Sequence, residues 1–76
     1  MDNHTQDCIR FFEIMAVSHE REAEDYAKRL EEASFSDPLH NYYFHEEMKE
    51  KAVAHAYRTC IEALTDPAYF QLTTKG

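Results

Sequence analysis

Residues 34–38 read Ser34-Phe35-Ser36-Asp37-Pro38, and this short stretch decides the fold. It holds one of the two prolines in a chain of 76 residues whose single glycine is Gly76. Ser36 or Asp37 can cap a helix that begins at Pro38, because a proline in the first helical turn gives up no backbone hydrogen bond. A break this short between two helical segments forces those segments to run antiparallel.

The segment before the break, about residues 5–33, has the apolar spacing of one helix. On a helical wheel one side gathers mainly apolar residues within a sector of roughly 80°. These positions are Cys8, Phe12, Met15, His19, Ala23, Tyr26, Leu30 and Ala33. The opposite side is charged, and it also carries Ile14 and Val17. The pattern predicts an amphipathic helix with a small apolar patch on its charged face.

The segment after the break, about residues 38–64, is apolar on two sides of the predicted helix. One apolar sector holds Leu39, Tyr43, Val53, Tyr57, Cys60, Ile61 and Leu64. The second holds Phe44, Met48, Ala52, Ala56, Thr59 and Ala63. A narrow polar stripe separates them and holds His40, Glu47, Lys51, Arg58 and Glu62. A helix that is apolar on two sides is normally buried on both.

We therefore expect an all-α fold, an antiparallel two-helix hairpin that assembles into an oligomeric helix bundle. The first helix can cover only one apolar sector of the second, so Phe44, Met48, Ala52 and Ala56 are the predicted oligomer interface. Pro67 repeats the break, and about residues 67–72 are expected to form a short third helical turn. Residues 1–76 make a single domain, since a chain this short has room for no more.

The charge of the chain indicates the kind of partner it would suit. Fifteen acidic residues against eight basic ones give a net charge of −7, which favours a basic protein surface over nucleic acid or an anionic membrane. Plain solubility is the other interpretation of this charge. The predicted partner-binding residues are carboxylates on the outward side of the first helix together with its small apolar patch. They are Glu20, Glu24, Asp25, Ile14 and Val17.

The function expected from these features is protein–protein interaction, as an inhibitor or adaptor. Short acidic chains of this kind are often accessory proteins of phages or mobile elements, which is an analogy of composition. The alternative is an oligomer that binds or sequesters a nucleotide-like anion at a helix–helix interface. Its predicted ligand-binding residues are His40, Tyr43, Tyr57 and Arg58. No glycine-rich phosphate loop accompanies them.

The sequence contains no recognisable catalytic or metal-binding motif, so neither an enzyme nor a cofactor is expected. None of the five histidines has a glutamate three residues before it, as a di-iron bundle requires. Whether His19 and His55 form a metal-binding or pH-sensing pair stays open. Cys8 and Cys60 are expected to be reduced, buried apolar residues, with a disulfide as the alternative. The chain has no long apolar run or signal sequence, and a cytoplasmic location is the expectation.

Overall fold

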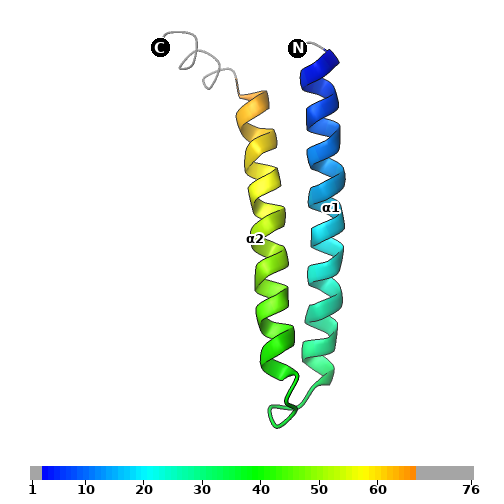
Figure 1. Ribbon diagram of the computed structural model, residues 1–76, viewed down its shortest axis with the longest axis vertical. Coiled ribbons are helices and arrows are strands. Elements are labelled where there is room, and N and C mark those ends of the chain that lie inside the picture. Colours follow the sequence, from blue (N-terminus) through cyan, green and yellow to red (C-terminus); the bar gives the residue numbers. More distant parts are fainter. Residues whose placement is uncertain (1–2, 67–76) are drawn as a thin grey trace.

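The computed structural model describes residues 3–66 of the chain, and these residues form two long helices. Helix α1 spans Asn3–Glu32 and helix α2 spans His40–Thr65. The helices lie side by side and run antiparallel, so the start of α1 and the end of α2 lie at the same end of the molecule (Figure 1). The predicted all-α hairpin is confirmed. The helical turn predicted at about residues 67–72 lies outside the described residues.

The connection between the helices is held by hydrogen bonds of its own. The amide of Asp37 donates to the Ser34 carbonyl at 2.9 Å, and the amide of His40 donates to the Asp37 carbonyl at 3.0 Å. The Asp37 side chain accepts a hydrogen bond from the Leu39 amide at 2.8 Å. Asp37 therefore closes the turn that leads into α2. The helix begins two residues later than predicted because Pro38 and Leu39 belong to this turn, and its N-cap is Leu39, without a side-chain capping hydrogen bond, and not Ser36 or Asp37.

The two helices meet along an inner face on which side chains recur at alternating spacings of four and three residues. This is the spacing of a coiled-coil seam. On α1 the inner face includes Phe12, Ala16, His19, Ala23 and Tyr26, and on α2 it includes Tyr43, Glu47, Glu50, Ala54 and Tyr57. Rings meet toward both ends of this face. Phe12 and Tyr57 lie 5.8 Å apart between ring centroids, and Tyr26 and Tyr43 lie 6.4 Å apart.

The prediction of which α2 residues face α1 was partly wrong. Leu39 is 49% exposed and Cys60 is exposed, whereas Glu47 and Glu50 are each only 7% exposed. The physical reason lies in residues 46–51, which read EEMKEK and offer no apolar stripe that could pack against α1. The glutamates occupy the inner face there because each finds a cationic or hydrogen-bonding partner.

The polar stripe predicted for the second helix is also corrected, since it does not form one solvated edge. Glu47 is buried, and His40 and Arg58 are half-buried.

The prediction for the two cysteines was only partly right. Both cysteines are free, as expected, but Cys8 is half-buried and Cys60 is exposed, because Cys60 lies beside the inner face and not on it.

Large side chains are poorly covered throughout the hairpin. Among residues 3–66 the buried apolar residues are three alanines, Ala16, Ala23 and Ala54. The radius of gyration is 17.1 Å, against about 11 Å for a compact domain of this length. The molecule measures 55 × 23 × 12 Å and is one layer of helices thick. A single layer cannot enclose a core, so the hairpin holds together mainly through a line of contacts.

Candidate functional site

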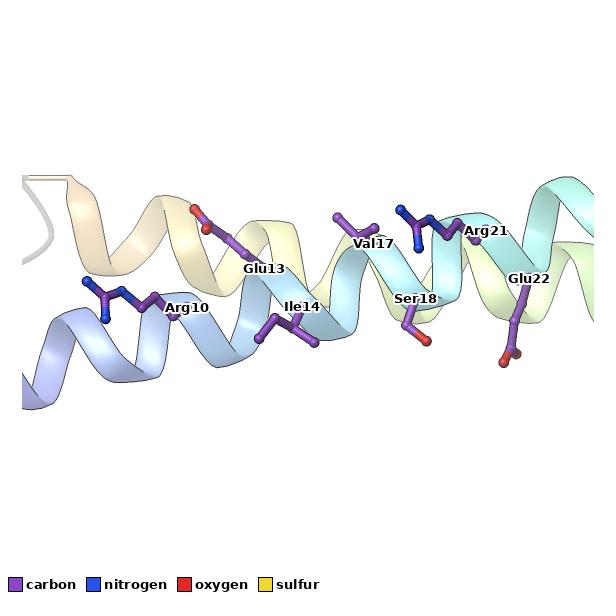
Figure 2. Close-up of a pocket in the computed structure, with 7 residues that line it drawn as sticks. All are labelled: Arg10, Glu13, Ile14, Val17, Ser18, Arg21 and Glu22. Atoms are coloured by element: carbon purple, nitrogen blue, oxygen red, sulfur yellow. The ribbon is translucent and has the colours of Figure 1, made fainter.

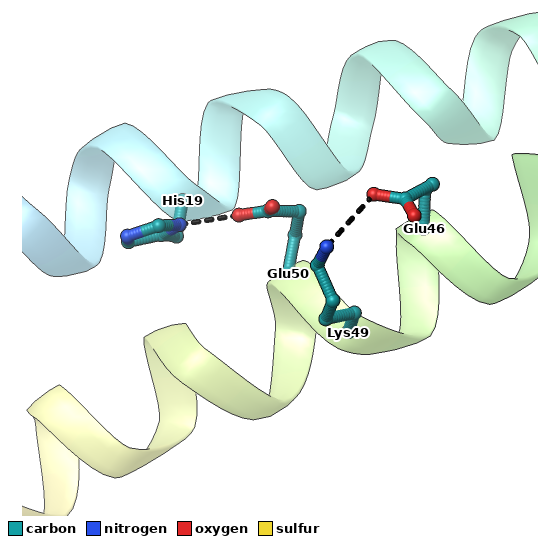
Figure 3. Close-up of polar contacts among 4 residues, drawn as sticks. All are labelled: His19, Glu46, Lys49 and Glu50. Carbon is teal, nitrogen blue, oxygen red and sulfur yellow. Dashed lines mark hydrogen bonds and ion pairs between the residues drawn. The ribbon is translucent and has the colours of Figure 1, made fainter.

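A group of polar side chains occupies the middle of the inner face. Nδ1 of His19 on α1 contacts Oε2 of Glu50 on α2, and this contact bridges the two helices (Figure 3). The imidazole of His19 also stacks on the ring of Tyr57, with centroids 6.0 Å apart and planes inclined by 14°. His19 is therefore held on two sides, by a carboxylate and by an aromatic ring.

A third side chain joins this pair. Glu22 follows His19 by three residues and so lies on the same side of α1. One ligand atom from each of His19, Glu22 and Glu50 can be chosen so that all three lie within 4.8 Å of one another. We call these three residues the His–Glu cluster. An imidazole and two carboxylates at this separation are groups that can bind a cation together.

Lysines on α2 pair with other glutamates of the same helix. Lys51 Nζ lies 2.7 Å from Glu47 Oε2, and Lys49 Nζ lies 3.2 Å from Glu46 Oε2. The hydrogen bond to Glu46 is the main reason that the pKa of Lys49 is raised above its usual value. Lys49 turns to Glu46, and Glu50 contacts His19 (Figure 3). The buried carboxylates of Glu47 and Glu50 are thus paired in different ways.

Glu20 and Arg58 form a second link between the helices. The guanidinium of Arg58 donates two hydrogen bonds to Glu20, from Nε at 3.1 Å and from Nη2 at 2.9 Å. These hydrogen bonds are the main cause that lowers the pKa of Glu20 and raises the pKa of Arg58. Glu20 was predicted to bind a partner, and its side chain is 45% exposed while its carboxylate is paired with Arg58. The long side chain of Arg58 reaches from α2 and binds the Glu20 carboxylate.

The other predicted partner-binding residues do lie on the surface. Glu24 and Asp25 are exposed, and Asp25 makes an i, i+4 ion pair with Arg29 at 3.7 Å. Ile14 is 67% exposed and Val17 is 37% exposed. The hairpin therefore keeps a solvent-facing acidic and apolar surface on α1, in which Glu20 is half-exposed and paired with Arg58.

Ile14 and Val17 are the apolar residues that line a groove on α1. Its lining residues are Arg10, Glu13, Ile14, Val17, Ser18, Arg21 and Glu22. Figure 2 shows that all of these side chains come from α1. The groove runs along one helix, and both positive and negative side chains line it. Glu22 belongs both to this groove and to the His–Glu cluster.

The predicted oligomer interface is a stripe on the outer side of α2. Phe44 is 45% exposed and Met48 is 41% exposed, and Ala52 and Ala56 are exposed as well. These four residues recur every four positions and so follow one side of the helix. We call them the outer stripe. Within the described hairpin, α1 leaves all four accessible, as the prediction requires.

The residues predicted for the alternative ligand site are not brought together. Tyr43 packs near Tyr26, and Tyr57 packs against Phe12. Fourteen residues of α2 separate the two tyrosines, a distance of about 21 Å along the helix axis. His40 lies against Phe35, 4.8 Å between ring centroids, at the hairpin turn. A single small anion cannot contact all of these residues in one chain.

The Glu-x-x-His pattern of di-iron bundles does not detect the His–Glu cluster. Here the glutamate follows, in the order His19-x-x-Glu22, which is equally able to place both groups on one side of a helix. The contribution of Glu50 has no local signal, since it lies 31 residues from His19. The open question about His55 is answered in part: His55 is exposed, and His19 contacts Glu50 and Tyr57.

Comparison of this chain with protein-family models, curated proteins and solved structures finds no match. Among the described residues, neither helix has the length and apolar content needed to cross a membrane.

Proposed function

We propose that this protein is a small acidic interaction module that self-associates through α2 and binds a protein partner with a basic surface. One observation carries the proposal. Residues 3–66 fully bury no large side chain, while eight large apolar residues are substantially exposed. The exposed set is Phe11, Ile14, Val17, Phe35, Leu39, Tyr42, Phe44 and Met48. A hairpin with this distribution gains most of its possible apolar burial only when it is bound to something else.

A second copy of the chain is the proposed occupant of the outer stripe. Two-helix hairpins complete a four-helix bundle by pairing, and the most common symmetric assembly is a two-fold dimer. The small residues Ala52 and Ala56 would let a facing helix approach closely, and Phe44 and Met48 would fill the space toward the hairpin turn. Dimerisation through this stripe leaves the outer side of α1 free.

The proposed surface for the basic partner is the outer side of α1. Glu24 and Asp25 are exposed there, and Ile14 and Val17 provide apolar area nearby. The net charge of −7 would draw a basic protein toward the hairpin before contact, and a field of this kind acts mainly on the association rate. Blocking a basic surface in this way is the action of an inhibitor or adaptor.

Light scattering and site-directed charge changes test the self-association. At tens of micromolar we expect a particle of about twice the 9.0 kDa chain mass. Met48→Glu should convert the particle to a monomer, because the dimer would otherwise bury an unpaired charge. Gln6→Glu, which adds the same charge at an exposed position of α1, should leave the dimer intact. A wild-type monomer at this concentration would refute the dimer.

Partner binding is tested by capture on the full chain followed by salt titration. Glu24→Gln with Asp25→Asn should weaken the affinity for a captured basic protein and flatten its salt dependence. Gln6→Ala is the matched surface control. Capture of acidic proteins alone, or affinity that does not respond to salt, would contradict the proposed partner class.

A further inference from the structure

We propose that His19, Glu22 and Glu50 bind a divalent transition-metal ion between the two helices. His19 and Glu22 come from adjacent turns of α1, and Glu50 comes from α2. Their ligand atoms lie within 4.8 Å of one another. The ion would link the helices at the middle of the inner face, which also holds the buried Ala16, Ala23 and Ala54.

The first support is the burial of Glu50. Glu50 is only 7% exposed. It occupies a position of the inner face where an apolar side chain would ordinarily be expected. A buried carboxylate is costly unless it is paired, and a buried pair with a histidine is weak evidence for stability. An ion-binding role gives a reason for a carboxylate at this position that packing alone does not.

The second support is the balance of charge around the cluster. Two carboxylates lie near a single imidazole. The two lysines next to Glu50 in the sequence form their ion pairs elsewhere, Lys49 with Glu46 and Lys51 with Glu47, although the charge of Glu50 also acts on Lys49 (Figure 3). Within residues 3–66 the Glu22 carboxylate makes no ion pair. A divalent cation would compensate both carboxylates at once, at short range.

The third support is the way the ligands are held and reached. His19 is oriented by its stacking on Tyr57, so its imidazole is positioned before any ion arrives. Glu22 is exposed and also lines the groove on α1, so the cluster opens to solvent on that side. Glu50 is therefore buried, His19 is held in place by Tyr57, and Glu22 can move toward an ion from the solvent side.

The donor set indicates the class of ion. Imidazole nitrogen with carboxylate oxygen suits zinc, iron or manganese better than the all-oxygen sites of magnesium and calcium. Around zinc at about 2.0–2.2 Å, tetrahedral ligand atoms lie ~3.3 Å apart. The exposed Glu22 carboxylate must therefore move toward the other two ligands, and an ion would replace the direct contact between His19 and Glu50. Three protein ligands leave the fourth zinc position to water.

Zinc titration of the full chain, without an affinity tag and after treatment with a chelator, tests the site. Isothermal titration calorimetry should show about one Zn²⁺ bound per chain, with no comparable signal for Mg²⁺. Glu22→Gln and Glu50→Gln should each weaken zinc affinity by about tenfold or more, since even indirect partners of a metal are worth this much. Glu31→Gln removes the same charge at another exposed position of α1 and should leave the affinity unchanged.

A second zinc-binding pair must be separated from the cluster. His4 Nε2 lies 3.9 Å from Cys8 Sγ, and these two groups could bind zinc by themselves. All titrations are therefore repeated on the His4→Gln, Cys8→Ser chain, in which the expected site is intact. Zinc binding that disappears in this chain, or that is equal in wild type, Glu22→Gln and Glu50→Gln, would overturn the proposal. So would the absence of zinc binding in a wild-type chain whose circular dichroism shows it to be helical.

Cobalt gives a readout that a purely structural role of these residues would not change. Bound Co²⁺ in a site with a histidine and two carboxylates should produce visible absorption that saturates at one ion per chain and is displaced by Zn²⁺. Glu22→Gln should remove this absorption while leaving the helix content unchanged, because Glu22 is exposed and contributes no core contact. Unaltered absorption in Glu22→Gln would exclude the cluster as the site. The result does not depend on whether the chain is a dimer or has a protein partner.

Discussion

The inner face of α2 carries two kinds of residue within four helical turns. Tyr43 and Tyr57 pack against aromatic rings of α1, whereas Glu47 and Glu50 between them are buried carboxylates. The aromatic positions supply large contact area, and the carboxylate positions supply little apolar burial. Large aromatic contacts therefore lie toward the two ends of the face, while its middle combines small buried alanines with polar side chains.

The two carboxylates themselves differ. Glu47 is paired with Lys51 on its own helix, at 2.7 Å, and the lysine side chain remains 58% exposed. Glu50 reaches across to His19 and lies near Glu22. The Glu47 pair is a local arrangement that any helix can make, since the two residues are four apart. The Glu50 contact exists only in the folded hairpin.

The largest expected effect comes from breaking the aromatic part of the face. Tyr57→Ala should lower the free energy of unfolding by about 2–4 kcal/mol, because it removes the ring that contacts Phe12 and His19. Urea denaturation followed by circular dichroism, at one fixed protein concentration, measures the change. Tyr57→Phe keeps the ring and should stay within about 1 kcal/mol of wild type. Equal losses in both variants would show that the hydroxyl matters more than the packing.

Replacing the polar residues in the middle of the inner face should have a smaller effect on the free energy of unfolding, and that effect should be stabilising. The double variant His19→Leu, Glu50→Leu should be more stable than wild type by about 1–3 kcal/mol without metal, since apolar residues often replace a buried pair favourably. Chelator-treated protein and the same urea experiment provide the measurement. Glu50→Leu alone leaves His19 without its partner and serves as the comparison. A less stable double variant would mean that the polar pair itself holds the helices together.

The smallest effect concerns the Glu20–Arg58 link and its dependence on pH. Arg58 lowers the pKa of Glu20 below its reference value of 4.5, chiefly through the side-chain hydrogen bond. The stabilisation is therefore complete above pH 4.5 and is lost as the pH falls through the lowered pKa of the folded state. Glu20→Gln should melt at a slightly lower temperature than wild type near pH 7, and the two should converge at lower pH. A difference that grows as the pH falls would contradict this sign.

Much of the architecture could be predicted from local sequence. Residues 34–38 break a chain that otherwise lacks turn-forming residues, and the helices on either side follow from the apolar spacing. The α1 inner face was also predictable, because Phe12, His19, Ala23 and Tyr26 recur at helical spacing. In each of these features the deciding residues lie within a few turns of one another.

Only the tertiary structure decided how the α2 side chains are used. Residues 46–51 have no apolar stripe, so periodicity could not show that Glu47 and Glu50 face inward. The pairing of Glu20 with Arg58 depends on how far an arginine reaches across the interface, and the His–Glu cluster depends on a residue 31 positions from His19. Local spacing sets which side of a helix a residue occupies. The register between two helices is set by packing along their whole length. That register determines which charged residues of α1 and α2 lie opposite each other.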